Sequence, residues 1–183
     1  MKISNPAGPL LLLLPSLILV PNPIVTDNNM AESSLSTHST NVTHNVNQSS
    51  MYMTKMTKMM ERGNIAMGFN QNKIAHHFAV TSNGGNITIT SLNSNDTQTI
   101  NQIKTHIMDI QKDFSEGNFT KPFFIHAQEV PGTDVMTKKK DLIKYNILEL
   151  RNGSSLVLIT NDKELLDAIS QFIKYQATAH VGH

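Results

Sequence analysis

The fold of this chain is decided by the stretch His76-His77-Phe78-Ala79-Val80-Thr81-Ser82-Asn83-Gly84-Gly85-Asn86-Ile87-Thr88-Ile89-Thr90. The Asn-Gly-Gly sequence at its centre is typical of a tight turn that joins two short strands. Because successive side chains of a strand point to opposite faces, we expect Phe78 and Val80 to face the core. His76 then points with them, and His77 points to the opposite face.

A helix is predicted directly after this hairpin. Asn95-Asp96 suits a helix N-cap, and apolar residues then recur at helical spacing, at Ile100, Ile103, Ile107 and Ile110. We expect this helix to run to about Phe114 and to stop at Gly117.

The second half of the chain repeats this order. Residues 143–150 and 155–160 are predicted strands on either side of a turn, and Asn161-Asp162 caps a helix that carries Leu165, Leu166, Ile169, Phe172 and Ile173. The sequence therefore predicts an α+β fold: a duplicated ββα–ββα unit with a four-stranded antiparallel sheet and helices on one face. Two hairpins without a shared sheet are the alternative, but a lone hairpin and helix bury too little core.

The segment between the two halves is predicted to contain little regular structure. Residues 121–126 suggest a loop entering a short extended segment, Val130-Pro131-Gly132 turns the chain, and residues 133–140 suggest a helical turn.

Composition shifts divide the chain into four parts. Residues 1–21 contain an apolar run, residues 10–20, which is typical of a signal peptide, with a retained membrane anchor as the alternative. Residues 22–50 are rich in Asn, Ser and Thr and are predicted to be a disordered linker. A Met-rich segment, 51–65, precedes the α+β domain, 66–183. We therefore expect a secreted or extracytoplasmic protein, anchored to a membrane only if the first segment is retained.

The Met-rich segment has two interpretations. Its Met53, Met56 and Met60 lie at helical spacing and can pack on the domain as a short helix. Thioether sulfur is also a soft ligand that suits Cu(I).

Charge and cysteine content exclude some classes of function. Fifteen basic and fourteen acidic residues balance, so the clustered positive face that nucleic-acid binding needs is not expected. The chain has no cysteine, so a metal site must use imidazole, carboxylate or thioether ligands. No Gly-x-Ser-x-Gly, Walker or dinucleotide-binding motif is present, and we predict neither catalytic nor cofactor-binding residues.

Histidine is the residue type that suggests chemistry. Neutral imidazole is a common ligand for zinc and copper when two or three rings converge. We predict His77, His106 and His126 as the main ligands of a copper or zinc ion, with His76 and His180 as further candidates. His183 lies beyond them in the tail.

Short motifs spread over two thirds of the chain carry a resemblance. They are Met67-Gly68-Phe69, His76-His77-Phe78, Gly84-Gly85-Asn86-Ile87, His106, Gly117-Asn118-Phe119 with Pro122, His126, Pro131-Gly132 and His180. In this pattern the chain resembles an uncharacterised family of small bacterial and archaeal domains, many of which carry a further histidine where this chain has Ser170. Some members are labelled aspartate carbamoyltransferase, but this domain is far too short and lacks that enzyme's Ser-Thr-Arg-Thr phosphate loop. The resemblance implies no function.

Three functions remain after sequence analysis. The first is an exported, non-enzymatic domain that binds a metal ion through histidines. The second is a structural or interaction module of the cell envelope without metal, whose helix-free sheet face contacts a partner protein or a second copy. The third is a hydrolase with a metal-activated water. This function needs a carboxylate base near the metal, and the sequence offers no candidate for it.

Overall fold

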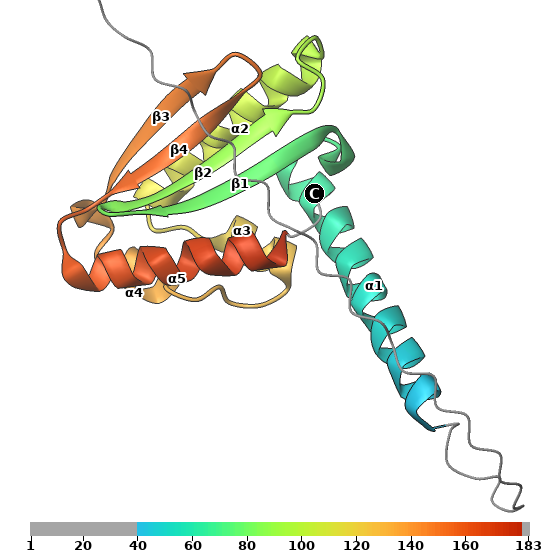
Figure 1. Ribbon diagram of the computed structural model, residues 1–183. Coiled ribbons are helices and arrows are strands. Elements are labelled where there is room, and N and C mark those ends of the chain that lie inside the picture. Colours follow the sequence, from blue (N-terminus) through green and yellow to red (C-terminus); the bar gives the residue numbers. More distant parts are fainter. Residues whose placement is uncertain (1–39, 181–183) are drawn as a thin grey trace, which may run out of the picture. The chain divides into compact units, whose positions relative to one another are not determined.

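The computed structural model describes residues 40–180, and the predicted leader, residues 22–39 of the predicted linker and His183 lie outside them. A four-stranded antiparallel sheet organises the described part, with strands β1 (Ile74–Thr81), β2 (Gly84–Ser91), β3 (Lys144–Leu150) and β4 (Gly153–Ile159). The strand order is β1-β2-β4-β3, so the two hairpins meet along β2 and β4 (Figure 1). The predicted α+β fold with one continuous sheet is confirmed.

The first hairpin forms where the sequence predicts it. His76 pairs with Ile89 and Phe78 with Ile87, so these side chains share one face of the sheet. Gly84 must be glycine, because a Cβ atom there would lie 2.0 Å from the carbonyl oxygen of Leu158. The prediction fails for Val80, which is 44% exposed at the far end of an edge strand.

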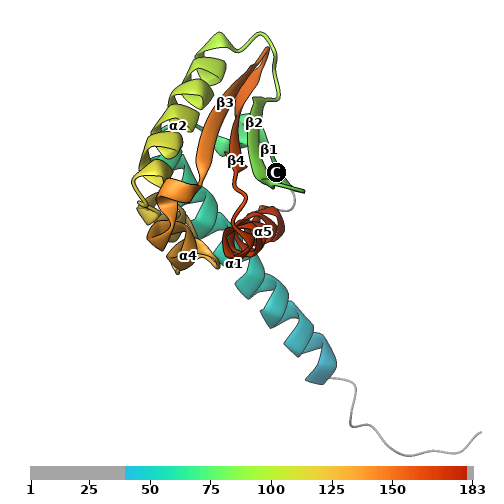
Figure 2. The same cartoon turned by 90° about the vertical axis from the view of Figure 1, so that its left-hand side faces the viewer.

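Two long helices, α2 (Thr97–Ser115) and α5 (Lys163–Ala179), pack on the face that carries these residues. Helix α2 packs mainly on β4 and β3, whereas α5 packs on β1 and β2, so each helix covers the strands of the other half. In Figure 2, α2 runs alongside β3, and α5 is viewed along its axis. The predicted helices on one face are confirmed, while internal duplication stays a prediction.

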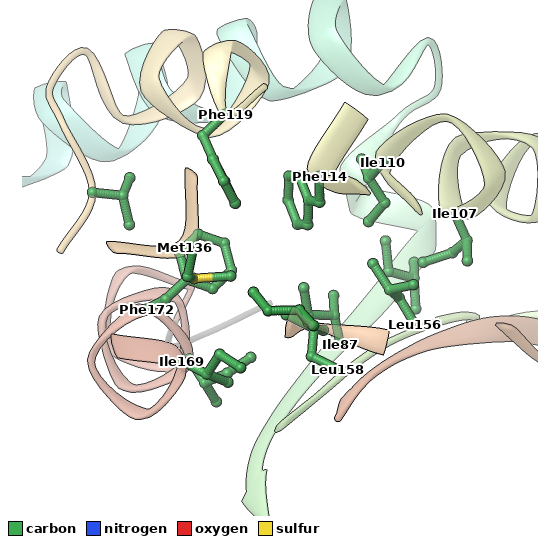
Figure 3. Close-up of a cluster of buried hydrophobic side chains, with 14 of the residues drawn as sticks. Ile87, Ile107, Ile110, Phe114, Phe119, Met136, Leu156, Leu158, Ile169 and Phe172 are labelled. Atoms are coloured by element: carbon green, nitrogen blue, oxygen red, sulfur yellow. The ribbon is translucent and has the colours of Figure 1, made fainter. Parts of the chain in front are cut away.

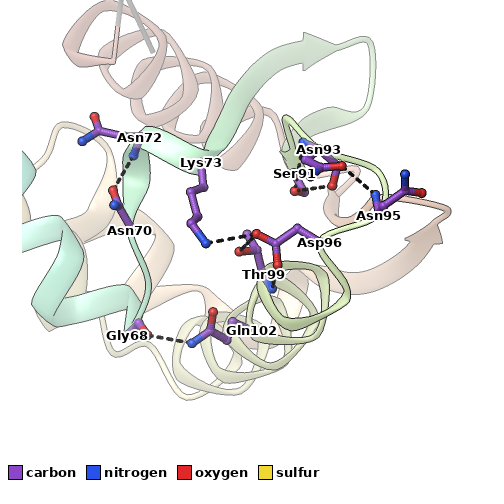
Figure 4. Close-up of polar contacts among 10 residues, drawn as sticks. All are labelled: Gly68, Asn70, Asn72, Lys73, Ser91, Asn93, Asn95, Asp96, Thr99 and Gln102. Carbon is purple, nitrogen blue, oxygen red and sulfur yellow. Dashed lines mark hydrogen bonds and ion pairs between the residues drawn. The ribbon is translucent and has the colours of Figure 1, made fainter.

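Both predicted helix caps are present. Asp96 accepts a hydrogen bond from the Thr99 N–H (3.0 Å), and Asp162 accepts one from the Leu165 N–H (3.0 Å). Lys73 Nζ lies 3.1 Å from Asp96 Oδ2 (Figure 4). The hydrogen bonds from Thr99, followed by the one from Lys73, lower the pKa of Asp96 to about 2.

The hydrophobic core lies between the sheet and the helices. Figure 3 shows its side chains pointing into one cluster, with Leu156 and Leu158 from β4 opposite residues of α2 and α5. Three aromatic rings close one end: Phe114 lies 4.6 Å from Phe119 and 5.8 Å from Phe172 between ring centroids. Each fully buried side chain of this kind contributes roughly 1.5–3 kcal/mol to folding.

The segment 120–126 corrects the sequence prediction. It forms α3 (Thr120–His126), not a loop with an extended segment, and α4 (Thr133–Lys138) is the predicted helical turn. Pro122 suggested a loop, but it lies in the first turn of α3, where a missing N–H costs nothing. The buried residues of α3, Pro122, Ile125 and His126, have helical spacing.

The Met-rich segment is helical, as one of its two interpretations predicts, but Met53 is 62% exposed and Met59 is the buried methionine. It belongs to a long helix, α1 (Thr40–Met67), which includes residues 40–50 of the predicted linker. Short 3₁₀ turns, η1 (Gln71–Lys73) and η2 (Lys140–Leu142), precede β1 and β3. None of the helices within residues 40–180 has the length and apolarity that crossing a membrane requires.

Candidate functional site

Four of the predicted histidines line one small cavity between the sheet and the helices. β1 supplies His76, α2 supplies His106, α3 ends at His126, and His180 is the C-terminal cap of α5. The cavity has a volume of about 50 Å³, and its remaining walls are largely apolar, including Ile87 and other isoleucines of β2 and α2. Four separate elements therefore bring imidazoles to one cavity. The sequence analysis named all four, His106 and His126 as main ligands and His76 and His180 as further candidates.

Three of the four rings lie close together. The ring centroid of His180 is 4.8 Å from that of His76 and 5.4 Å from that of His126. Phe78 stacks against His76 at 5.8 Å and lies 5.5 Å from His180. The alternation of β1 explains this grouping, because residues 76 and 78 point to the same face.

The ring of His126 is held by two residues of α5. Its Nε2 lies 2.9 Å from Oε1 of Gln176, and the ring of Tyr175 meets it edge-on at 5.0 Å. An amide oxygen only accepts, so Nε2 of His126 carries the proton and donates, which leaves the lone pair on Nδ1. A fixed tautomer of this kind is typical of metal-binding histidines.

Burial keeps two of the histidines neutral. Burial, aided by the charge of Lys121 and opposed by that of Asp113, lowers the pKa of His106 to about 4. Burial also lowers the pKa of His126; the hydrogen bond to Gln176 opposes that change, and the nearby Arg62 and Lys55 add to it.

The predicted main ligand His77 does not belong to this cavity. It is exposed, and it lies on the opposite face of β1 from His76. The grouping of His77 with His106 and His126 is therefore corrected: strand alternation places His76 at the cavity instead. His183 lies outside the described residues.

Sequence analysis missed Gln176, the hydrogen-bond partner of His126. Gln176 is only 6% exposed and follows Phe172 and Ile173 at helical spacing on the buried face of α5. A polar residue within an apolar stripe was the available signal, since buried polar groups are normally hydrogen-bonded.

The resting arrangement of the site is not a preformed chelate. Among residues 40–180, no group of three or more His, Cys, Asp or Glu side chains is already placed to hold a metal ion. Coordination would therefore require the rings to turn. Comparisons of the chain with protein-family models, curated proteins and solved structures found no significant match.

Proposed function

We propose that this domain binds one copper or zinc ion through the imidazoles of His76, His126 and His180. The observation that carries the proposal is the convergence of these three rings, from three separate elements, at one small cavity with largely apolar walls. An exported role is part of the proposal and is supported by the apolar run at residues 10–20.

The spacing of the rings suits a shared ion. Nitrogen–metal bonds of about 2.0–2.1 Å in tetrahedral geometry separate neighbouring imidazole centroids by roughly 5 Å. The separations at His180 are 4.8 and 5.4 Å. Two of the three ring pairs therefore have the separation expected of neighbouring ligands on one ion.

The chemistry of the rings supports the same conclusion. Imidazole nitrogen suits zinc and copper, and it binds them in the neutral form. The pKa values of His106 and His126 are lowered, so both rings stay neutral at pH values where an ordinary histidine is protonated. Gln176 supplies the outer hydrogen bond that orients a ligand, and His106 is the candidate fourth ligand because it lines the same cavity.

Two adjacent histidines provide the test. The purified chain is loaded with Zn²⁺ or Cu²⁺ and dialysed, and its metal content is measured by elemental analysis. We expect about one equivalent in the wild type and in His77→Gln, and a loss of retained metal in His76→Gln. Retention by His76→Gln, or no metal in the wild type with either ion, would contradict the proposal.

A second candidate function is that of an interaction module without metal. Leu148 and Leu150 of β3 are 54% and 36% exposed and lie on the sheet face opposite the helices. This observation favours self-association through the open face. Light scattering tests it: the candidate predicts a dimer that Leu148→Glu dissociates, and a monomer at all concentrations rejects it.

A further inference from the structure

A second, larger pocket lies beside α1, and His126 forms part of its wall. The pocket has a volume of about 240 Å³, and α1 contributes Lys55, Met56, Met59 and Arg62 to its lining. Residues of α5 and of the segment after α3 complete it. The histidine cavity and this pocket share only His126 among their lining residues.

The charged residues of this pocket are all cations. Lys55 and Arg62 line it, and no aspartate or glutamate does. Neither cation forms an ion pair within the part of the chain that the structure describes. Arg62 is oriented by its Nε–H, which donates to the carbonyl oxygen of Ile125 at 2.8 Å. Among the described residues its two terminal nitrogens have no hydrogen-bond partner, so they can meet a ligand.

The remaining walls are mostly apolar. Met56, Met59 and the ring of Tyr175 line the pocket, and the exposed lining is largely carbon. Methionine side chains adapt well to irregular apolar ligands. The volume is slightly below the range of about 300–1,000 Å³ of pockets for drug-sized molecules, so the occupant must be small.

We propose that this pocket binds a small organic anion with an apolar body and one carboxylate. The body packs against Met56, Met59 and Tyr175, and the carboxylate pairs with Lys55 and Arg62. A cationic or purely apolar ligand would leave two cations uncompensated beside it. This site does not depend on the proposed metal site.

Octanoate is the probe, and titration calorimetry on the full, metal-free chain in the presence of a chelator is the measurement. Octanol has the same chain without the charge, and acetate has the charge without the chain. We expect octanoate to bind at least tenfold more tightly than octanol, and acetate not to bind measurably. Because the protein is free of metal, the result does not depend on whether the proposed metal site binds an ion.

Two exposed lysines of α1 provide matched variants. Lys55 lines the pocket and Lys58 does not, although Lys58 lies nearby on the same helix. Lys55→Gln should weaken octanoate binding about tenfold, the effect of one charge-assisted hydrogen bond, and leave octanol binding unchanged. Lys58→Gln should leave both unchanged. Equal affinity for octanoate and octanol, equal effects of the two variants, or no octanoate binding at millimolar concentration would overturn the proposal.

Discussion

His126 and Gln176 join α3 to α5 through one buried hydrogen bond, from Nε2 of the imidazole to Oε1 of the amide at 2.9 Å. Both residues are 6% exposed. His180 follows Gln176 by four residues, and its backbone N–H donates to the Gln176 carbonyl oxygen. One helical turn thus carries both the residue that orients His126 and the histidine whose ring meets it edge-on.

Replacement of Gln176 should weaken metal binding without removing a ligand. Gln176→Leu removes the acceptor that fixes the tautomer of His126, and loss of such an outer contact typically lowers metal affinity by about 10–100-fold. Competition with a chelating dye measures the change. Gln171→Leu is the control, because Gln171 is exposed on the same helix and its side chain, within residues 40–180, bonds to Asp167 alone. Equal affinities of the two variants would contradict the role given to Gln176.

Burial of neutral His106 should make stability depend on pH. Its pKa is near 6.5 in the unfolded chain and about 4 in the folded protein, so the unfolded state binds an extra proton between these values. Above pH 6.5 the ring is neutral in both states and adds no pH dependence; as the pH falls to 4, the folded state loses about 3 kcal/mol of stability relative to the unfolded state.

The variant His106→Gln isolates this effect. Denaturant unfolding at several pH values should show a shallower loss of stability between pH 6.5 and 4 than in the wild type. His77→Gln, which changes an exposed histidine, should retain the wild-type slope. A parallel pH dependence of His106→Gln and wild type would show that His106 protonates without cost in the folded state.

The cations of α1 should influence the titration of His126. Arg62 and Lys55 both lower its pKa, so Lys55→Gln is expected to raise the pKa of His126 toward its ordinary value. Titration of the ring resonances by NMR measures the shift, with Lys58→Gln as the control. If the pKa of His126 were unchanged or lower in Lys55→Gln, the charge of Lys55 would not be one of the causes that lower it.

Two glycines with positive φ should differ in their tolerance of a side chain. Gly68 (φ +75°) has open space where a Cβ atom would lie, whereas at Gly132 (φ +85°) that atom would lie 2.1 Å from the carbonyl oxygen of Ala168. Gly68→Ala should cost about 1–2 kcal/mol of unfolding free energy from its left-handed backbone alone. Gly132→Ala should cost clearly more, measured by urea unfolding. Equal costs would mean that α4 and α5 move apart readily.

The sequence predicts those parts of the fold that depend on local patterns. Alternation around Asn83-Gly84-Gly85 and the capping carboxylates of Asp96 and Asp162 locate both hairpins and both long helices. The sequence does not predict α3, because proline occurs both in loops and in the first turn of helices, where Pro122 lies. Local patterns do not distinguish these cases.

The site was only partly predictable for a related reason. Strand alternation separates His76 from His77 but does not say which face meets α3 and α5. That choice depends on the packing of α5 over β1 and β2, which brings His180 to His76 and Gln176 to His126. These contacts join residues 50 or more positions apart, and no local pattern specifies them.

X-ray absorption at the zinc edge of the loaded protein tests the central claim most directly, because it reports the ligands of the bound ion. The account predicts nitrogen at about 2.0 Å with the outer-shell scattering of at least three imidazoles. It also predicts that His180→Gln removes one of them while His77→Gln removes none. A shell of oxygen ligands without imidazole scattering, or a spectrum altered by His77→Gln, would contradict the account.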